Sequence, residues 1–185
     1  AIFSGLVMAF LLTMADGAAL HLREILSFFG GGLLLVTVGV IDDFIELSPL
    51  ARFAAQIVAA LLMIFGAGVV LTDLGGMTLS GRLLTMGVFA VPFTVFATLG
   101  VINALNMCDG LDGLSGSLSL VSLTGLFFAA WLWGDVADVI LLPLLGSAVV
   151  GFLLFNLRLP GRERASIFMG DAGSMFLGFA LTWYA

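Results

Sequence analysis

The sequence is short of charged residues. Only 10% of its 185 residues are Asp, Glu, Lys or Arg, whereas an ordinary soluble domain has roughly 25%. Hydrophobic residues make up 62% of the chain, and the mean hydropathy is +1.25. This composition excludes a soluble globular domain and indicates a polytopic membrane protein.

Several residue types that define common classes of site are also scarce. There is no lysine, and the six bases, all arginine, are outnumbered by 12 acids, a net charge of -6 that does not favour nucleic acid as a ligand. The single cysteine, Cys108, excludes an internal disulfide, and with the single histidine, His21, it cannot form a zinc site, so we expect both to be structural. No Walker A, GxSxG or HExxH motif occurs in the three acidic segments at residues 39–49, 103–117 and 166–174, which disfavours an ATPase or a hydrolase.

Long apolar runs predict an all-α fold, a polytopic transmembrane helical bundle. A full span needs about 20 residues, and we expect five complete spans at residues 25–41, 53–72, 83–101, 117–134 and 139–157. The apolar runs at the two ends, residues 1–14 and 173–185, are shorter, and the first residue is Ala, so we expect an excerpt of a longer protein with two partial spans. Because the sequence contains no internal repeat or linker, we expect residues 1–185 to form a single membrane-embedded domain.

The arginines predict the orientation of the chain. Residues 158–165 hold three of the six, and such loops face the cytoplasm. Strict alternation of the spans then places residues 42–52 and 103–116 on the same side. The three carboxylate-rich segments, residues 39–49, 103–117 and 166–174, are therefore expected on one face of the membrane.

The first acidic segment is GVIDDFIELSP, residues 39–49. If its helix continued, Glu46 would share a face with Asp42 and Asp43, a like-charge crowding that a nearby cation would offset. Ser48 and Pro49 are typical of an N-cap followed by the first residue of a helix. The alternative is an ordinary solvated loop.

The second acidic segment is NALNMCDGLDGLSGS, residues 103–117. Asn103, Asn106, Asp109 and Asp112 recur every three residues, so neighbouring members share a helix face, and the glycines among them let the backbone approach a ligand. Asn and Asp oxygens are ligands that Mg²⁺ prefers, often completed by substrate phosphates. The alternative is a polar turn in which these residues act as caps.

The third acidic segment is SIFMGDAGS, residues 166–174. Asp171 opens the last apolar run, where it could be a metal ligand or only an N-cap. Three arginines shortly before it are candidates for phosphate contacts or only the topology signal: Arg158, Arg162 and Arg164. Carboxylates from three loops beside arginines at one membrane face favour metal-assisted phosphoryl transfer, which depends mainly on positioning and charge neutralisation.

In these three segments, which occur in the family's order, the chain resembles the polyprenyl-phosphate N-acetylhexosamine-1-phosphate transferases of glycosyltransferase family 4. The resemblance implies an integral enzyme of the bacterial inner membrane with a cytoplasmic active site. It implies transfer of a sugar-1-phosphate from a UDP-sugar to undecaprenyl phosphate with release of UMP, a step that initiates a cell-envelope glycan. It further implies Mg²⁺ or Mn²⁺ as cofactor, and it allows a homodimer.

The resemblance also assigns roles to residues. Asp42 and Asp43 match a DD pair, of which one is implied to deprotonate the lipid phosphate and the other to assist the metal. Asp109 and Asp112 match aspartates implied to position nucleotide and metal, with Asn103 and Asn106 beside them. The candidate metal ligands are therefore Asp171, Asp43 and Asp109, and Met107 is more similar to the branch that uses UDP-N-acetylglucosamine. The family's first helices and His-rich loop have no counterpart here, as expected of an excerpt.

Two other classes of membrane protein also carry acidic residues in or near their spans. A CDP-alcohol phosphotransferase would continue DGxxAR after its first aspartate, but here Asp109-Gly110 leads to Leu111-Asp112-Gly113. An ion-coupled transporter remains the alternative function, because acids within membrane segments often mark ion pathways. Transport acids should lie near the midplane, however, whereas the aspartates of these three segments are predicted at span ends.

Overall fold

A computed structural model describes residues 22–79, 82–133, 136–158 and 164–185. The first predicted partial span and Arg162 lie outside these residues, as does His21. The helices are α2 Leu22–Ile45, α3 Pro49–Leu61, α4 Ala90–Cys108, α5 Leu114–Trp133, α6 Val136–Asn156 and α7 Gly170–Tyr184.

The predicted helical membrane bundle is confirmed. Among the described residues, five helices are long and apolar enough to cross a membrane, and they correspond in order to the five predicted spans: Leu22–Ile45, Pro49–Ala67, Gly87–Cys108, Leu114–Leu132 and Val139–Asn156. The last apolar run forms α7. The predicted boundaries differ from the observed ones by a few residues for most spans, because helix ends depend on local capping that hydropathy does not report.

The connection between the second and third spans was predicted wrongly. Residues 68–72, assigned to a span, lie beyond the helix, and residues 83–85 belong to a strand instead of a helix. Strands β1 (Asp73–Leu79) and β2 (Arg82–Thr85) pair antiparallel, with Asp73 opposite Thr85 and Leu79 opposite Arg82. Short apolar runs are consistent with either element, so hydropathy alone could not identify this hairpin.

The ends of α3 show how the sequence shapes this helix. Ser48 caps its first turn by accepting a hydrogen bond from the Ala51 N–H, and Pro49 occupies the first helical position, as predicted. At its other end the helix widens into a π-helical segment, η1 Leu62–Ala67. Gly68, with φ of 77°, then ends it in the left-handed region that glycine adopts without strain.

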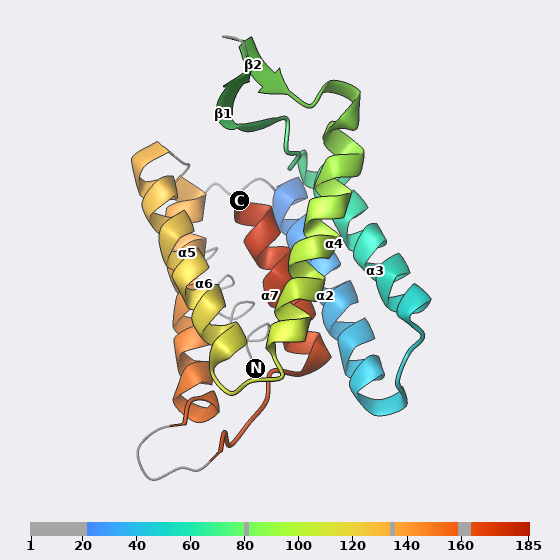
Figure 1. Ribbon diagram of the computed structural model, residues 1–185, viewed down its shortest axis with the longest axis vertical. Helices are drawn as coiled ribbons and strands as arrows, with labels where there is room; N and C mark the ends of the chain where they lie inside the picture. The colour runs from blue at the N-terminus through green and yellow to red at the C-terminus, as the bar shows by residue number, and fades with distance from the viewer. Residues whose placement is uncertain (1–21, 80–81, 134–135, 159–163) are drawn as a thin grey trace.

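Helix α7 lies at the centre of the bundle. It packs against α2 on one side and α4 on the other, while α5 and α6 form a pair beside them (Figure 1). Its side chains Phe176, Leu177 and Phe179 are almost fully buried, as are Leu35 of α2 and Ile102 of α4, which pack in the same core. The end of α7 that carries Asp171 is therefore held from two directions.

One end of the bundle gathers the acidic segments. There α2 ends, α3 begins, α4 ends, α5 begins, α6 ends and α7 begins, whereas the hairpin lies at the opposite end (Figure 1). We call the first of these the acidic end. Three segments that are far apart in the sequence thus meet at one face, as the alternation of spans predicted.

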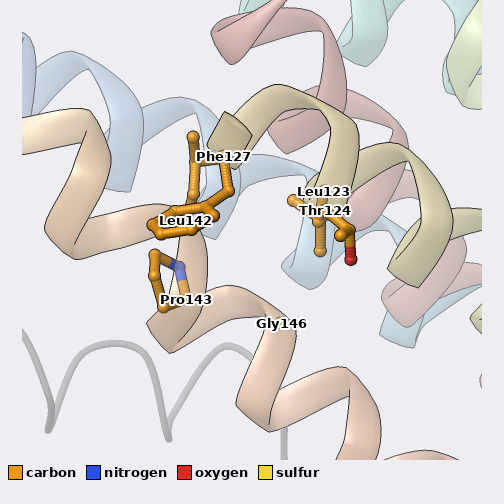
Figure 2. A pocket seen from close by; sticks show the side chains of 6 residues that line it. All are labelled: Leu123, Thr124, Phe127, Leu142, Pro143 and Gly146. Atoms are coloured by element: carbon orange, nitrogen blue, oxygen red, sulfur yellow. The ribbon is translucent and has the colours of Figure 1, made fainter. Parts of the chain in front are cut away.

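A small pocket lies between α5 and α6, away from the acidic end. It has a volume of about 240 Å³, and Pro143, inside α6, helps to form it (Figure 2). A proline removes one intrahelical hydrogen bond, which membrane helices tolerate. The lining is mainly apolar and consists of Leu123, Thr124, Phe127, Leu142, Pro143 and Gly146.

Candidate active site

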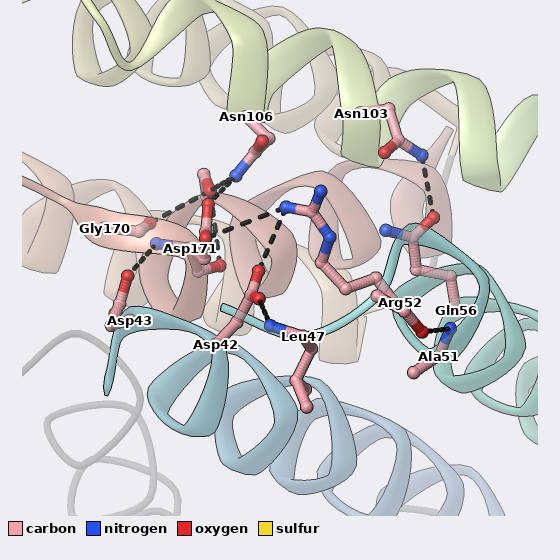
Figure 3. Close-up of polar contacts among 12 residues, drawn as sticks. Asp42, Asp43, Leu47, Ala51, Arg52, Gln56, Asn103, Asn106, Gly170 and Asp171 are labelled. Atoms are coloured by element: carbon pink, nitrogen blue, oxygen red, sulfur yellow. Dashed lines mark hydrogen bonds and ion pairs between the residues drawn. The ribbon is translucent and has the colours of Figure 1, made fainter. Parts of the chain in front are cut away.

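The first turn of α7 is where the three acidic segments meet. The Gly170 N–H donates to Asp109 Oδ2 at 3.0 Å. The next amide, that of Asp171, donates to Asp43 Oδ1 at 3.0 Å (Figure 3). The first amides of a helix lack intrahelical acceptors, and negative charge is favourable there. Carboxylates from α2 and from the α4–α5 loop thus bind two successive backbone amides. We call Asp42, Asp43, Asp109 and Asp171 the acidic cluster.

The Asp171 side chain faces α4 and α3. Its Oδ1 accepts a hydrogen bond from the Asn106 amide, which also donates to Ser174 Oγ at 3.0 Å. Its Oδ2 lies 3.9 Å from Arg52 Nη1 (Figure 3). Met169 is the residue at the N-cap position, and it makes no side-chain capping bond. The N-cap interpretation of Asp171 is therefore wrong, and its carboxylate points into the cluster.

Asp42 is the buried member of the cluster. Only 5% of the residue is exposed, and its Oδ2 forms an ion pair with Arg52 Nη1 at 3.0 Å while its Oδ1 accepts the Leu47 N–H. Helix α2 ends at Ile45, and Glu46 turns the chain with φ of 45°. The helical geometry that the expected crowding of Glu46 with the aspartates required therefore ends before Glu46. The positive charge that compensates Asp42 is the guanidinium of Arg52.

Asp109 is held from both sides just after α4. Its Oδ1 accepts the Ser115 hydroxyl at 2.8 Å, and its Oδ2 accepts the Gly170 N–H. Burial raises the pKa of Asp109, which the Ser115 and Gly170 hydrogen bonds partly offset, and the nearby Asp43 charge raises it further. The site is therefore one in which a carboxylate's charge is costly until a cation approaches.

Asp112 is bonded to the α6–α7 loop. Its Oδ2 accepts from Arg158 Nε at 2.8 Å and from the Ala165 N–H at 3.1 Å, and its side chain is only 8% exposed. The Arg158 hydrogen bond, with that from Ala165, lowers the pKa of Asp112. Two predicted site residues, Asp112 and Arg158, thus pair with each other. Arg164 is exposed.

Asn103 also has a partner outside the acidic cluster. One turn from Asn106, it donates to Gln56 Oε1 of α3 at 2.7 Å (Figure 3). It also donates to the Leu99 carbonyl at 2.7 Å. The structure therefore brings Asn106 to the acidic cluster and places Asn103 at the contact between α3 and α4.

The sequence interpretation missed several polar residues of this end. Arg52 and Gln56 lie on α3 four residues apart, and each is a polar side chain in a predominantly apolar span, which is itself a signal of function or of a specific partner. Ser115, Ser174 and Asn156 are buried and hydrogen-bonded, but small polar residues give no comparable signal. Their roles depend on contacts between distant segments.

The donor chemistry of the cluster suits a hard cation. Carboxylate oxygens are the ligands that Mg²⁺ prefers, and such sites often use one or two carboxylates and leave the remaining positions to water and phosphate. Within the described residues no group of three or more His, Cys, Asp or Glu side chains converges as a metal site. Two carboxylates, Asp43 and Asp109, each use one oxygen to bind an adjacent amide, so a cation at this cluster would need further ligands such as phosphate oxygens.

The chain matches known proteins along most of its length. Residues 25–185 match glycosyl transferase family 4. A protein named undecaprenyl-phosphate alpha-N-acetylglucosaminyl 1-phosphate transferase from Yersinia pestis is 35% identical over 98% of this chain and 48% of its own length. Proteins of the same name from Haemophilus influenzae and Escherichia coli K12 are 37% and 35% identical over 81% of this chain, and 42% and 40% of their own lengths. The chain thus spans about half the length of these relatives, and it belongs to glycosyl transferase family 4.

Proposed function

We propose that the protein transfers N-acetylglucosamine-1-phosphate from UDP-N-acetylglucosamine to undecaprenyl phosphate and releases UMP. The relatives' printed name describes this acceptor and this sugar. The observation that carries the proposal is the convergence of four aspartates and Arg52 around the first turn of α7 at one end of a membrane bundle. A lipid phosphate can reach that end from the bilayer while a water-soluble nucleotide reaches it from solution.

The site has the features that phosphoryl transfer needs. Such reactions depend on positioning and on stabilising negative charge at the transferring group. We assign to Asp43, Asp109 and Asp171 the binding of Mg²⁺, or of Mn²⁺, which when bound would neutralise charge on the pyrophosphate. The guanidinium of Arg52, already between two carboxylates, is a second source of positive charge.

The two aspartates of α2 differ in their surroundings. Both oxygens of Asp42 are engaged by Arg52 and Leu47, whereas Asp43 is exposed and accepts a hydrogen bond from the first turn of α7. Asp43 is thus the better placed to meet the acceptor phosphate. An oxygen of that phosphate attacks the sugar-bearing phosphorus, the bond from this phosphorus to the oxygen bridging it to UMP breaks, and UMP leaves with that oxygen.

A two-step route through an aspartyl phosphate is the rival, with Asp42 as the nucleophile. The Arg52 ion pair of Asp42 argues against it, because attack would require Asp42 to give up that partner. Phosphate trapped on Asp42 would establish the two-step route. Full metal-dependent turnover by Asp42→Asn would remove Asp42 from both schemes.

Substrate contacts belong to the same proposal. Asn106 binds Asp171 of the acidic cluster. It remains a proposed contact to the nucleotide or its phosphates, as do Asn103, Arg158, Arg162 and Arg164. Arg158 would have to exchange its Asp112 partner for substrate. We also propose that the acidic end faces the cytoplasm of the bacterial inner membrane, and that a homodimer is compatible with the reaction.

The test uses membranes that contain the full-length protein. They are incubated with radiolabelled UDP-N-acetylglucosamine, undecaprenyl phosphate and Mg²⁺, and labelled lipid and UMP are measured, with EDTA and an Asp43→Asn variant as controls. We expect equal amounts of both products, lost in both controls. Absence of labelled lipid and of UMP from active preparations would overturn the assignment of this sugar.

A further inference from the structure

Helix α2 meets α7 through glycines. Its buried stripe includes Gly31, Leu35 and Gly39, spaced four residues apart. At Gly31 an added Cβ would meet the tip of the Phe179 ring at 2.8 Å, a flexible side chain that can move. At Gly39 it would meet backbone, Asp171 C at 2.8 Å and the N and Cα of Ala172 closer still. The two helices thus touch backbone to backbone only a few residues from the acidic cluster.

This contact lies within one turn of the reacting groups. Asp42 and Asp43 follow Gly39 by three and four residues on α2, and Asp171 directly precedes Ala172 on α7. The Asp171 N–H binds Asp43 at 3.0 Å, and Arg52 bridges Asp42 and Asp171. The separation of the two backbones at Gly39 therefore sets where the carboxylates of α2 stand relative to that of α7.

We propose that Gly39 is a positioning residue, whose missing side chain lets α2 approach α7 closely enough for Asp42 and Asp43 to meet the first turn of α7. The proposal rests on the proposed transferase function for its catalytic consequence. Real Cβ atoms essentially never come as close as a methyl here would, and backbone cannot rotate away as a side chain can. A methyl at Gly39 must therefore separate the helices, and a misplacement of about 1 Å can lower a rate about 100-fold.

The chain offers matched controls. Gly30 lies on the same helix with nothing within 4 Å of an added Cβ, so Gly30→Ala tests the effect of alanine alone. Gly178 on α7 meets Ile102 Cα of α4 at 2.5 Å, so Gly178→Ala introduces a backbone clash of the same kind two turns from Asp171. Comparing these with Gly39→Ala separates lost packing from lost positioning.

The experiment measures kcat, KM for both substrates, thermal stability and hydrogen exchange of segment 168–174 in the purified full-length protein. We expect Gly39→Ala to lower kcat by about 10- to 100-fold with KM changed less than about threefold. Its 168–174 amides should exchange faster than in Gly30→Ala, because the Asp43 bond is lost. Gly178→Ala should lower thermal stability by a comparable amount with a much smaller loss of kcat.

Two results would overturn the proposal. One is a kcat for Gly39→Ala equal to that of Gly30→Ala, and the other is an equal loss of kcat in Gly178→Ala at equal stability. If Gly39→Ala does not fold, Ala172→Gly tests the proposal instead, because it leaves the close contact between the α2 and α7 backbones in place. Its kcat should stay within about threefold of wild type, and a larger loss would show that the contact depends on the Ala172 side chain.

The failures of the two proposals are distinguishable. If the wild-type protein makes no labelled lipid, the transferase assignment fails, and hydrogen exchange alone still tests the spacing at Gly39. If the wild type is active and Gly39→Ala matches it in kcat and in exchange, the positioning role fails and the assignment stands.

Discussion

Arg52 joins two carboxylates that would otherwise repel each other. Its guanidinium lies 3.0 Å from Asp42 and 3.9 Å from Asp171, with 34% of its side chain exposed. We predict that Arg52→Ala destabilises the protein by about 1–3 kcal/mol, the cost of leaving a buried acceptor unsatisfied, and strongly lowers kcat. Unfolding in mixed micelles and steady-state kinetics measure the two effects.

Arg52→Lys is the control for this prediction, because it keeps the charge but loses the forked guanidinium that can bridge two carboxylates. It should recover most of the stability and only part of kcat. Full activity in Arg52→Ala would show that the guanidinium plays no part in catalysis.

Asp112 gives a pH-dependent prediction at the same scale. Arg158 and the Ala165 amide lower the pKa of Asp112 in the folded protein, so its folded pKa lies below the unfolded value. The stabilisation is therefore complete above the ordinary aspartate pKa of about 4 and is lost as the pH falls through the lower folded pKa. We predict that Asp112→Asn lowers the thermal midpoint at neutral pH and that the difference from wild type shrinks below about pH 4. A difference that is constant across this range would contradict the ion pair.

At the scale of elements, Asn156 links two loops of the acidic end. Its Oδ1 accepts the Gly113 N–H and its Nδ2 donates to the Ile167 carbonyl, both at 2.8 Å, with 2% of the residue exposed. One residue thus fixes the α4–α5 loop, which carries Asp109, to the segment that leads into α7. Gly113, with φ of 81°, is the glycine that permits the turn there.

We predict that Asn156→Ala destabilises the protein by about 1–3 kcal/mol, because it leaves the buried Gly113 N–H without its partner and removes the bond to the Ile167 carbonyl. Hydrogen exchange should rise in both loops together, and this joint change is the measurement that identifies a link. Asn156→Ser is the milder comparison, since it keeps a polar group. An increase confined to one loop would contradict the linking role.

Some of the helices could be predicted from the sequence alone, and other elements could not. The apolar runs predicted the spans, and the Ser48-Pro49 pair predicted the start of α3, because both signals are local. The hairpin of β1 and β2 was missed because β1 lies between two predicted spans and β2 lies largely at the start of the second of them, and their pairing depends on contacts that hydropathy does not report. The π-helical end of α3 was missed too, since no composition signal distinguishes it from an α-helix.

For the whole molecule, the gathering of the acidic segments at one end predicts one-sided accessibility. We predict that cysteines replacing Asp43, Asp109 and Asp171 in a Cys108→Ala background react with an impermeant maleimide only in inside-out vesicles. A cysteine at Val88, which is 88% exposed and lies next to the hairpin, should react only in right-side-out vesicles. Labelling of the aspartate positions from both sides would favour a transport pathway.

The sequence by itself determined the membrane bundle, the order of its spans and the meeting of three acidic segments at one end, because hydropathy and strict alternation of crossings are properties of the chain alone. The tertiary structure decided which groups pair: Asp43 and Asp109 with the first amides of α7, Asp42 with Arg52, and Asp112 with Arg158. Hydrogen bonds and ion pairs depend on distances of a few tenths of an ångström. Those distances are set by how closely α2 and α4 approach α7, at Gly39 and Gly178, between residues far apart in the sequence.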